Sequence, residues 1–327
     1  MPTHATSAPY RWRNFGIWAS SLSRQVPDAV SVGVIGVGSM GGAIVERLLA
    51  LGYRVSVWDV VSDRIAESVA RGASPTGSAA ELVSSHEFII ASLPSPQAVE
   101  NTFTDPRLVE SLRPGSITID MSTVGPNTSR KVYRVFSRKG AHYLDAPVSG
   151  GPRRAAAGKL TISVGGDYDA FLKGEPLLKA LGEKVFYVGG PGSGSTMKLI
   201  NQLLVFAHSY AAMEALVLCK ALNVDPAKMY EVVTAGSGNS FMFQEMVKLA
   251  LGGQLWGGRT ELLIKDIRLT SRMAVESGLS LSLCRFLSDI AEKMDYAGLG
   301  GEDAVKGFLE YVAGASQNKE QESKSTR

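Results

Sequence analysis

The fold of this chain is decided by one stretch near its start, Val32-Gly33-Val34-Ile35-Gly36-Val37-Gly38-Ser39-Met40-Gly41. Val34 and Ile35 are strand-forming residues, and the segment Ala43–Leu49 continues with the apolar spacing of an amphipathic helix. The glycines between them have the spacing G-x-G-x-x-G. The first allows a tight turn, the second lets a ligand approach the backbone, and the third lets the helix pack close to the strand. The stretch therefore predicts a strand, a glycine-rich turn and a helix.

A second predicted strand, Arg54–Trp58, ends at Asp59, which lies 18 residues after Gly41. This spacing is close to the roughly 20 residues expected for the acid that binds the ribose of a dinucleotide. A plain strand–helix–strand packing unit is the alternative interpretation. A carboxylate at Asp59 favours NAD because it repels a 2′-phosphate, whereas nearby Arg64 keeps NADP possible. The predicted cofactor contacts in this region are Gly36, Val37, Gly38, Ser39, Met40, Gly41 and Asp59.

The composition is that of an ordinary globular protein of about two domains, with 327 residues, 45% hydrophobic and 20% charged. The net charge of +3 and the lack of a basic stripe argue against a nucleic-acid partner. No apolar run of about 18 residues predicts a membrane span. Cys219 and Cys284 lack metal-ligand spacing, so we expect no metal site, and we expect both thiols to be reduced and buried.

Both ends of the chain differ in composition from the rest. Residues 1–30 are rich in Arg and Ser and poor in acids, which is typical of an organellar transit peptide, although an untargeted flexible extension has the same composition. A cytoplasmic and a mitochondrial-matrix location are therefore both open. Residues 316–327 are polar, and their composition predicts a disordered tail.

Residues 31–190 alternate between strand and helix patterns. This alternation predicts an α/β domain of the Rossmann type, a doubly wound and mostly parallel sheet with helices on both faces. Helices are predicted at Ser62–Ala70, after the capping box Ser78–Glu81, and from Pro126 onward. Further strands are predicted at residues 88–93, 116–120, 141–145, 160–164 and 185–188.

Residues 191–315 contain no convincing strand and predict an all-α C-terminal domain that begins with one long helix. The apolar surface of such a domain favours a homodimer or homotetramer. Helices are predicted at residues 196–222, 227–234, 241–251, 260–276, 281–296 and 304–313.

Four motifs occur in one order along the chain. They are Gly36–Gly41, Asp120-Met121-Ser122-Thr123, Asp145-Ala146-Pro147-Val148-Ser149-Gly150-Gly151, and Gly192–Asn201 with Lys198 inside it. Over about residues 31–315 the chain resembles the β-hydroxyacid dehydrogenases, the family of 3-hydroxyisobutyrate dehydrogenase, tartronate semialdehyde reductase and L-threonate dehydrogenase. The resemblance implies an NAD(P)-dependent oxidoreductase that acts on CH–OH groups of a small hydroxy acid.

Lys198 is the candidate acid/base. It lies one turn into the long helix, after a glycine-rich turn and within an apolar run. Burial and the positive end of a helix both disfavour the ammonium form, and a lowered pKa suits proton exchange with an alcohol. A lysine that extends its amine into solvent is the alternative. The resemblance implies the catalytic role.

Ser122 and the Ser149-Gly150-Gly151 segment follow predicted strand ends. In an open parallel sheet, ligands bind beyond the carboxyl ends of the strands, where hydroxyl and backbone N–H groups hold a carboxylate. Ordinary turn chemistry would use the same residue types. The resemblance assigns both segments to the substrate carboxylate and places Ser122 among the catalytic residues.

Two amides follow Lys198 on the same helical face, Asn201 at the third position and Gln202 at the fourth. Either could reach the substrate, and Asn201 is the favoured catalytic partner, although a packing amide is the alternative for both. The resemblance adds Leu93, Pro94, Thr123 and Lys265 as cofactor contacts, and Gln202, Ser240 and Phe241 as substrate contacts.

The expected reaction is the NAD-dependent oxidation of a 3-hydroxyisobutyrate-type acid. An L-threonate-type dehydrogenase, a semialdehyde or imine reductase, and a non-catalytic dinucleotide-binding protein are the alternatives. The intact Lys198 argues against the last of these, because a protein that only binds the dinucleotide has no use for an acid/base.

Overall fold

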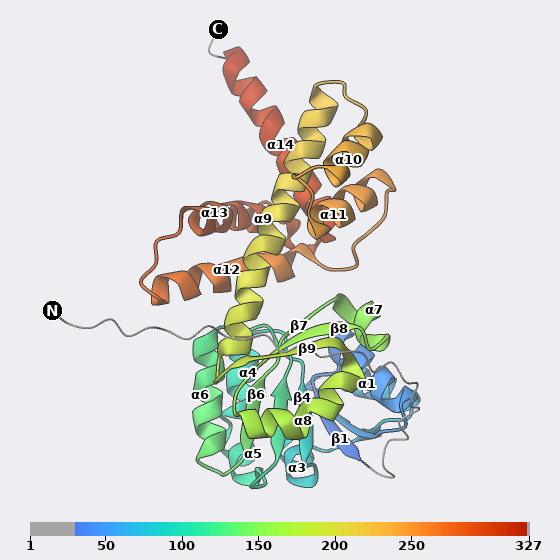
Figure 1. Ribbon diagram of the computed structural model, residues 1–327, viewed down its shortest axis with the longest axis vertical. Helices are drawn as coiled ribbons and strands as arrows, with labels where there is room; N and C mark the ends of the chain where they lie inside the picture. The colour runs from blue at the N-terminus through green and yellow to red at the C-terminus, as the bar shows by residue number, and fades with distance from the viewer. Residues whose placement is uncertain (1–29, 326–327) are drawn as a thin grey trace, which may run out of the picture.

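The computed structural model describes residues 30–325, arranged as a sheet domain and a helical domain (Figure 1). The long helix α9 (Ser193–Ala221) starts in the sheet domain and runs through the centre of the helical one. The predicted targeting segment lies outside the described residues.

The sheet has strand order β3-β2-β1-β4-β5-β6-β8-β7, with β9 paired to β8. The six neighbouring strands β3, β2, β1, β4, β5 and β6 are parallel to one another. Strand β8 is antiparallel to β6 and β7, and β9 is parallel to β8. The order reverses between β1 and β4, which is the position where open sheets bind ligands. The strands are β1 (Ser31–Ile35), β2 (Arg54–Trp58), β3 (Ser74–Pro75), β4 (Phe88–Ala91), β5 (Ile117–Asp120), β6 (His142–Asp145), β7 (Val148–Ser149), β8 (Leu160–Gly165) and β9 (Gly182–Gly189).

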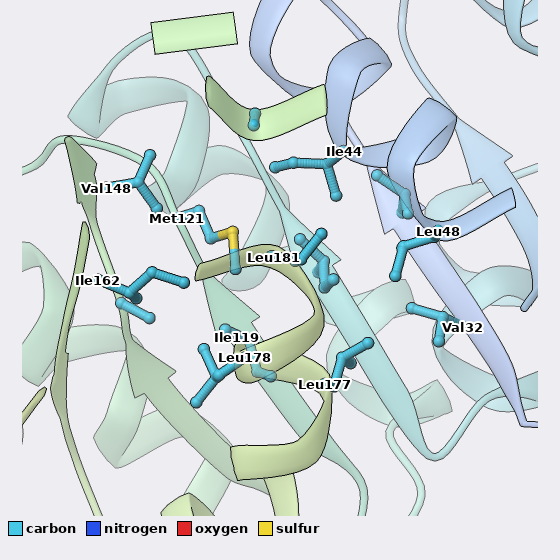
Figure 2. Packing of buried hydrophobic residues seen from close by; sticks show 14 of the residues in the cluster. Val32, Ile44, Leu48, Ile119, Met121, Val148, Ile162, Leu177, Leu178 and Leu181 are labelled. Atoms are coloured by element: carbon cyan, nitrogen blue, oxygen red, sulfur yellow. The ribbon is translucent and has the colours of Figure 1, made fainter. Parts of the chain in front are cut away.

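Helices cover both faces of the sheet, which confirms the predicted doubly wound α/β fold. One hydrophobic core joins α1 and α8 to one face and includes Ile44, Ile119 and Leu178 (Figure 2). A second core joins α3, α4 and α6 to the other face and includes Phe103 and Tyr143. The helices of this domain are α1 (Ser39–Ala50), α2 (Ser62–Ala70), α3 (Ala79–Ser85), α4 (Pro96–Phe103), α5 (Pro106–Ser111), α6 (Pro126–Ser137), α7 (Gly151–Ala156) and α8 (Tyr168–Leu181).

Capping side chains determine where several of these helices begin. The Ser78 hydroxyl accepts a hydrogen bond from the Glu81 N–H at 3.0 Å, as the capping box predicted. Ser95 accepts from the Ala98 N–H at 3.1 Å and Pro96 opens α4. Proline suits this first position because it has no N–H to leave unpaired in the first turn of a helix.

The C-terminal domain is all-helical, as predicted, and within residues 193–325 the extended pairing is a single bridge between Arg259 and Asp303. The last helix continues beyond Ala313 into the tail that was expected to be disordered. Gln, Glu and Lys in that tail are good helix formers. The helices after α9 are α10 (Pro226–Ala235), α11 (Phe241–Leu251), α12 (Thr260–Glu276), α13 (Ser282–Tyr296), the 3₁₀ helix η1 (Leu299–Gly301) and α14 (Ala304–Ser325).

Helix α9 is the central element of the helical domain. Its Phe206 and Met213 are buried in one core with Met246 of α11, Ile264 of α12 and Phe308 of α14. Among the described residues it is the one helix long and apolar enough to cross a bilayer, a test that the core helix of a globular domain also passes. Cys219 on α9 and Cys284 on α13 are buried free thiols, as expected.

Candidate active site

The three glycines of the first turn each meet a different requirement. Gly36 has φ +83°, and a Cβ there would lie 2.4 Å from the Ser92 carbonyl oxygen. A Cβ on Gly41 would lie 1.9 Å from the Gly36 carbonyl oxygen. A Cβ on Gly38 would meet only the Arg64 guanidinium, at 3.7 Å. The fold therefore requires glycine at positions 36 and 41, whereas Gly38 leaves open space beside the turn.

The N-terminus of α1 faces this open space. Gly38 is its N-cap and supplies no side chain, so the first-turn N–H groups remain available to an anion. The Asp59 carboxylate, 7% exposed, accepts hydrogen bonds from the N–H groups of Val37 at 2.8 Å and Val61 at 2.9 Å. Arg64 lies 3.8 Å from Asp59 as an exposed ion-pair partner. A glycine turn, free N–H groups and an acid at the end of β2 fit a dinucleotide.

Ser122, at the end of β5, is buried beside the loop that follows β4. Its hydroxyl oxygen accepts a hydrogen bond from the Leu93 N–H at 2.8 Å, and its own N–H donates to Asp120 at 2.9 Å. Burial raises the pKa of Asp120, whose carboxyl also accepts a hydrogen bond from the Tyr143 hydroxyl. Ser122 therefore holds the Leu93–Pro94 loop in place, and its hydroxyl also hydrogen-bonds to the Asp120 carboxyl, which opposes the effect of burial on the pKa of Asp120.

Lys198 is half-buried on α9, and its Nζ donates a hydrogen bond to the Ser149 hydroxyl at 3.2 Å. Burial lowers the pKa of Lys198 from its usual 10.5 to about 8; the Asp266 carboxylate opposes this shift and the Lys265 ammonium adds to it. A lysine with this pKa exchanges protons readily near neutral pH. Gly150 and Gly151, which follow Ser149, have φ values of +131° and +72°.

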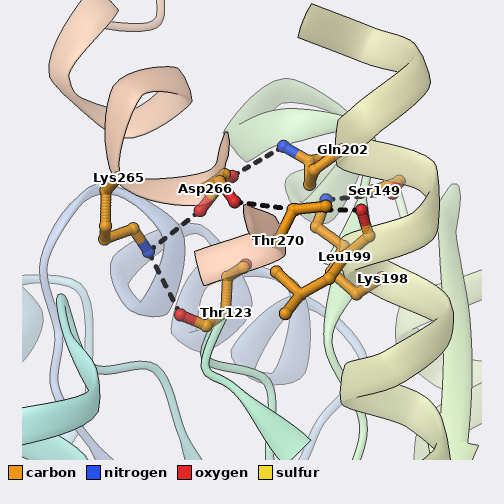
Figure 3. A network of polar contacts seen from close by, with 8 residues as sticks. All are labelled: Thr123, Ser149, Lys198, Leu199, Gln202, Lys265, Asp266 and Thr270. Atoms are coloured by element: carbon orange, nitrogen blue, oxygen red, sulfur yellow. Dashed lines mark hydrogen bonds and ion pairs between the residues drawn. The ribbon is translucent and has the colours of Figure 1, made fainter. Parts of the chain in front are cut away.

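A polar network connects α9, α12 and the sheet domain (Figure 3). The Gln202 amide donates to Asp266 at 2.6 Å, and Lys265 Nζ lies 3.2 Å from the other oxygen of Asp266. Lys265 also donates to the carbonyl oxygen of Thr123 at 3.1 Å. The helical domain thus reaches the carboxyl ends of the strands through Lys265, and it places a buried carboxylate near Lys198.

The two candidate amides differ in their surroundings. Gln202 is 7% exposed and contacts Asp266 directly. Asn201 is exposed and donates to the Gln202 side-chain oxygen at 3.0 Å, so it is connected to Asp266 only through Gln202. The structure therefore brings Gln202 closer to the polar centre than Asn201, which the sequence interpretation had favoured.

Ser240 and Phe241 are not drawn into this network. The Ser240 hydroxyl caps α11 by accepting from the Phe243 N–H at 3.0 Å, and Phe241 is 72% exposed. None of the contacts recorded between residues 30 and 325 joins either side chain to Lys198. Their assignment as substrate contacts therefore stays a prediction.

Two acids matter more than the sequence interpretation indicated. Asp266 is not among the predicted site residues, yet it is the carboxylate that accepts a hydrogen bond from Gln202 and acts on Lys198. Asp145 was noted only as the first residue of a motif, yet it binds the start of α9. The sequence signal that could have identified Asp145 is its place as an acidic residue at the end of the predicted strand at residues 141–145.

Two family models match successive parts of the chain. Residues 31–189 match the NAD binding domain of 6-phosphogluconate dehydrogenase. Residues 192–308 match a model described as NAD-binding of NADP-dependent 3-hydroxyisobutyrate dehydrogenase. The boundary between the two models falls in the turn between β9 and α9.

Characterised relatives and solved structures agree with these models. The chain is 33% identical to 2-(hydroxymethyl)glutarate dehydrogenase of Eubacterium barkeri, over 88% of this chain and 97% of that protein. It is 33% identical to L-threonate dehydrogenase of Cupriavidus necator, over 84% and 93% of the two chains. The structure of 3-hydroxyisobutyrate dehydrogenase from Mycobacterium tuberculosis with L-serine aligns with a TM-score of 0.80 at 27% identity, over 86% and 98%.

The chain belongs to the β-hydroxyacid dehydrogenase family. It is an oxidoreductase that acts on hydroxyl groups of small hydroxy acids and uses NAD(P) as its cofactor. The resemblance noted from the four motifs is thereby confirmed.

Proposed function

We propose that this protein oxidises a short 3-hydroxyisobutyrate-type acid with NAD, and that Lys198 is the acid/base. The observation that carries the proposal is the setting of Lys198. Its amine is held by Ser149, its pKa is about 8, and the Asp266 carboxylate lies close enough to influence it. A lysine that simply extended its amine into solvent would keep a pKa near 10.5.

The bound cofactor supplies the hydride acceptor. Neutral Lys198 accepts the proton of the substrate hydroxyl as hydride leaves the carbon bonded to that hydroxyl. In the reverse reaction, protonated Lys198 returns the proton to the carbonyl oxygen. Ser149 contacts the amine, and its hydroxyl, together with the backbone of Gly150 and Gly151 that follow it in the chain, would hold a substrate carboxylate. Ser122 orients the Leu93–Pro94 loop.

Asp59 supports a preference for NAD over NADP. Its buried carboxylate is aimed at the glycine-rich turn, and a 2′-phosphate there would face that charge. Arg64 offsets the charge only weakly, because it is half exposed and 3.8 Å away.

The substrate is tested by measuring NAD⁺ and NADP⁺ reduction with purified protein across 3-hydroxyisobutyrate, L-threonate, 2-(hydroxymethyl)glutarate, L-serine and D-glycerate. Turnover with NAD⁺ and 3-hydroxyisobutyrate as the best pair is the expected result. A preference for L-threonate would favour the second candidate, which the Cupriavidus necator relative supports. A panel without turnover, with NAD⁺ bound, would contradict the proposal and direct attention to aldehyde or imine reduction.

We also propose a homo-oligomer formed through the helical domain. Ile200 and Leu204 on α9 are 47% and 49% exposed, and Phe286 on α13 is 51% exposed. Exposed apolar side chains on neighbouring helices favour self-association. Light scattering on the protein as it elutes from a size-exclusion column should give the mass of a dimer or tetramer. The mass of a monomer at micromolar concentration would contradict the proposal.

A further inference from the structure

The start of α9 is capped from another element of the fold. Its N-cap, Gly192, has φ +86° and supplies no side chain. The Asp145 carboxylate at the end of β6 instead accepts hydrogen bonds from the N–H groups of Gly192 at 2.8 Å and Ser195 at 2.7 Å. First-turn N–H groups have no partner within a helix, so both oxygens of Asp145 satisfy groups that would otherwise be buried and unpaired.

Packing around this contact leaves the helix start little freedom. A Cβ on Gly194 would lie 2.2 Å from the Asp145 carbonyl oxygen and 2.5 Å from that of Ser163. A Cβ on Gly165 would lie 2.7 Å from both Asp145 Oδ1 and the Gly194 nitrogen. The first turn of α9 therefore rests directly on the backbone of β6 and β8.

The same short segment contacts α9 a second time. Four residues after Asp145, Ser149 accepts the hydrogen bond from Lys198 at 3.2 Å. Ser195 and Lys198 are three residues apart on the helix and so lie on one side of it. The segment from Asp145 to Ser149 thus binds both the backbone that carries Lys198 and the amine at the end of its side chain.

We propose that Asp145 is a positioning residue of the enzyme, whose carboxylate fixes the first turn of α9 and thereby keeps the Lys198 amine buried against Ser149. The inference rests on the proposed function, because it assigns the effect of Asp145 to the acid/base role of Lys198. Asp145 itself contacts the helix start and not the reacting atoms.

The ionisable groups near Asp145 are Asp120 on β5, Tyr143 on β6 and Arg130 on α6, which donates to the Pro191 carbonyl oxygen at 3.3 Å. Burial raises the pKa of Asp145 to about 6, against the lowering effect of the Ser195 and Gly192 N–H groups. At pH 7 and above, a range that includes the pKa of Lys198, Asp145 is therefore mainly a carboxylate. A negative charge at that point also suits the positive end of the helix.

The test compares Asp145→Asn with Asp225→Asn in the full chain. Asp225 caps α10 by accepting from the Ala227 N–H at 2.9 Å, far along the chain from Lys198, so it is a matched helix-capping acid. For each variant, kcat and kcat/KM for hydroxy acid oxidation are measured from pH 6 to 10.5, together with NAD⁺ affinity. The pH at which the rate reaches half its plateau reports the pKa of Lys198.

In Asp145→Asn we expect kcat to fall by about 10- to 100-fold. The half-plateau pH should rise from about 8 towards 10.5, because a loosened Lys198 is better hydrated. NAD⁺ affinity should stay within about twofold. Asp225→Asn should leave the half-plateau pH unchanged. An unshifted half-plateau pH in Asp145→Asn would overturn the proposal. Normal turnover in Lys198→Ala would instead overturn the proposed function, so the two failures are distinct.

Hydrogen exchange on the unaltered protein decides the matter if Asp145→Asn does not fold. The N–H groups of Gly192 and Ser195 should exchange at least about tenfold more slowly than first-turn N–H groups of α13, whose N-cap Leu281 supplies no capping side chain. Equal exchange rates at the two helix starts would overturn the inference.

Discussion

Lys198 Nζ on α9 donates a hydrogen bond to the Ser149 hydroxyl at the end of β7, over 3.2 Å. This contact joins the two domains of the chain at the carboxyl ends of the strands. It directs the amine to the place where a parallel sheet binds ligands, and it keeps the amine away from bulk solvent. The chemistry proposed for the protein depends on this one geometry.

Replacing Lys198 by alanine should lower kcat by about 10²- to 10⁴-fold, the usual contribution of a positioned acid/base. NAD⁺ binding, followed by fluorescence titration, should be unchanged because the hydrogen bond of the Lys198 amine is to Ser149 and not to the glycine-rich turn. Lys220→Ala is the matched control, since Lys220 is an exposed lysine near the other end of α9. Turnover near that of the unaltered enzyme in Lys198→Ala would refute the catalytic role.

The pH profile should follow the ionisation of Lys198. Burial lowers the pKa of this lysine to about 8, so the neutral base predominates only above that pH. Oxidation of the hydroxy acid should therefore rise with pH and level off above about 8, whereas reduction of the product should fall over the same range. Initial rates in both directions, measured from pH 6 to 10, test this expectation; a half-plateau pH near 10.5 in the oxidation direction would contradict it.

Lys198 should also reduce the stability of the fold at neutral pH. The folded protein holds this lysine with a pKa of about 8 and the unfolded chain with 10.5, so between these values the unfolded state binds more protons and stability rises with pH. Below pH 8 the burial cost is present in full. Lys198→Met should therefore raise the free energy of unfolding by about 1–3 kcal/mol at pH 7 and lose that advantage towards pH 10.5. Urea denaturation at pH 7 and pH 10.5 measures the free energies of unfolding. The same difference between Lys198→Met and the unaltered protein at both pH values would contradict the prediction.

Asp59→Asn should weaken discrimination between the two cofactors. The substitution removes the charge that would repel a 2′-phosphate and keeps one oxygen for the Val37 or Val61 N–H. We expect the ratio of kcat/KM for NAD⁺ to that for NADP⁺ to fall by about tenfold, equivalent to 1.4 kcal/mol. Asp63→Asn, in the first turn of α2, is a nearby control. An unchanged ratio in Asp59→Asn would remove Asp59 from the determinants of preference.

Two glycine substitutions should affect different properties of the protein, one its stability and the other its affinity for NAD⁺. Gly41→Ala places a Cβ 1.9 Å from the Gly36 carbonyl oxygen, so α1 must shift, and the protein should lose about 1–3 kcal/mol of stability. Gly38→Ala meets nothing closer than 3.7 Å and should fold normally. The added methyl occupies the approach to the turn, so NAD⁺ affinity should fall at least about tenfold. Thermal melts and NAD⁺ titrations of both variants separate the two cases; tight NAD⁺ binding by Gly38→Ala would contradict the cofactor site.

Much of the fold was predictable because local signals agree with the tertiary arrangement. Alternating strand and helix patterns before Gly190 predicted the parallel sheet, and the bounds predicted for α11 and α12 match the structure. The short helices α4 and α5 were not among the predicted helices; they have only 8 and 6 residues, and each begins at a proline. Helix α14 continues past Ala313, since good helix formers extend it beyond its apolar positions.

Among the candidate site residues, the sequence by itself determined those whose role follows from local backbone geometry. The glycine spacing from Gly36 to Gly41, the acid at Asp59 and the lysine one turn into α9 are readable from residue order alone. Only the tertiary structure decided which side chains meet Lys198. Ser149 is 49 residues away, and Asp266 is 64 residues from Gln202, which it contacts. Such pairs form because separate strands and helices pack together and bury them, and burial is also what lowers the pKa of Lys198.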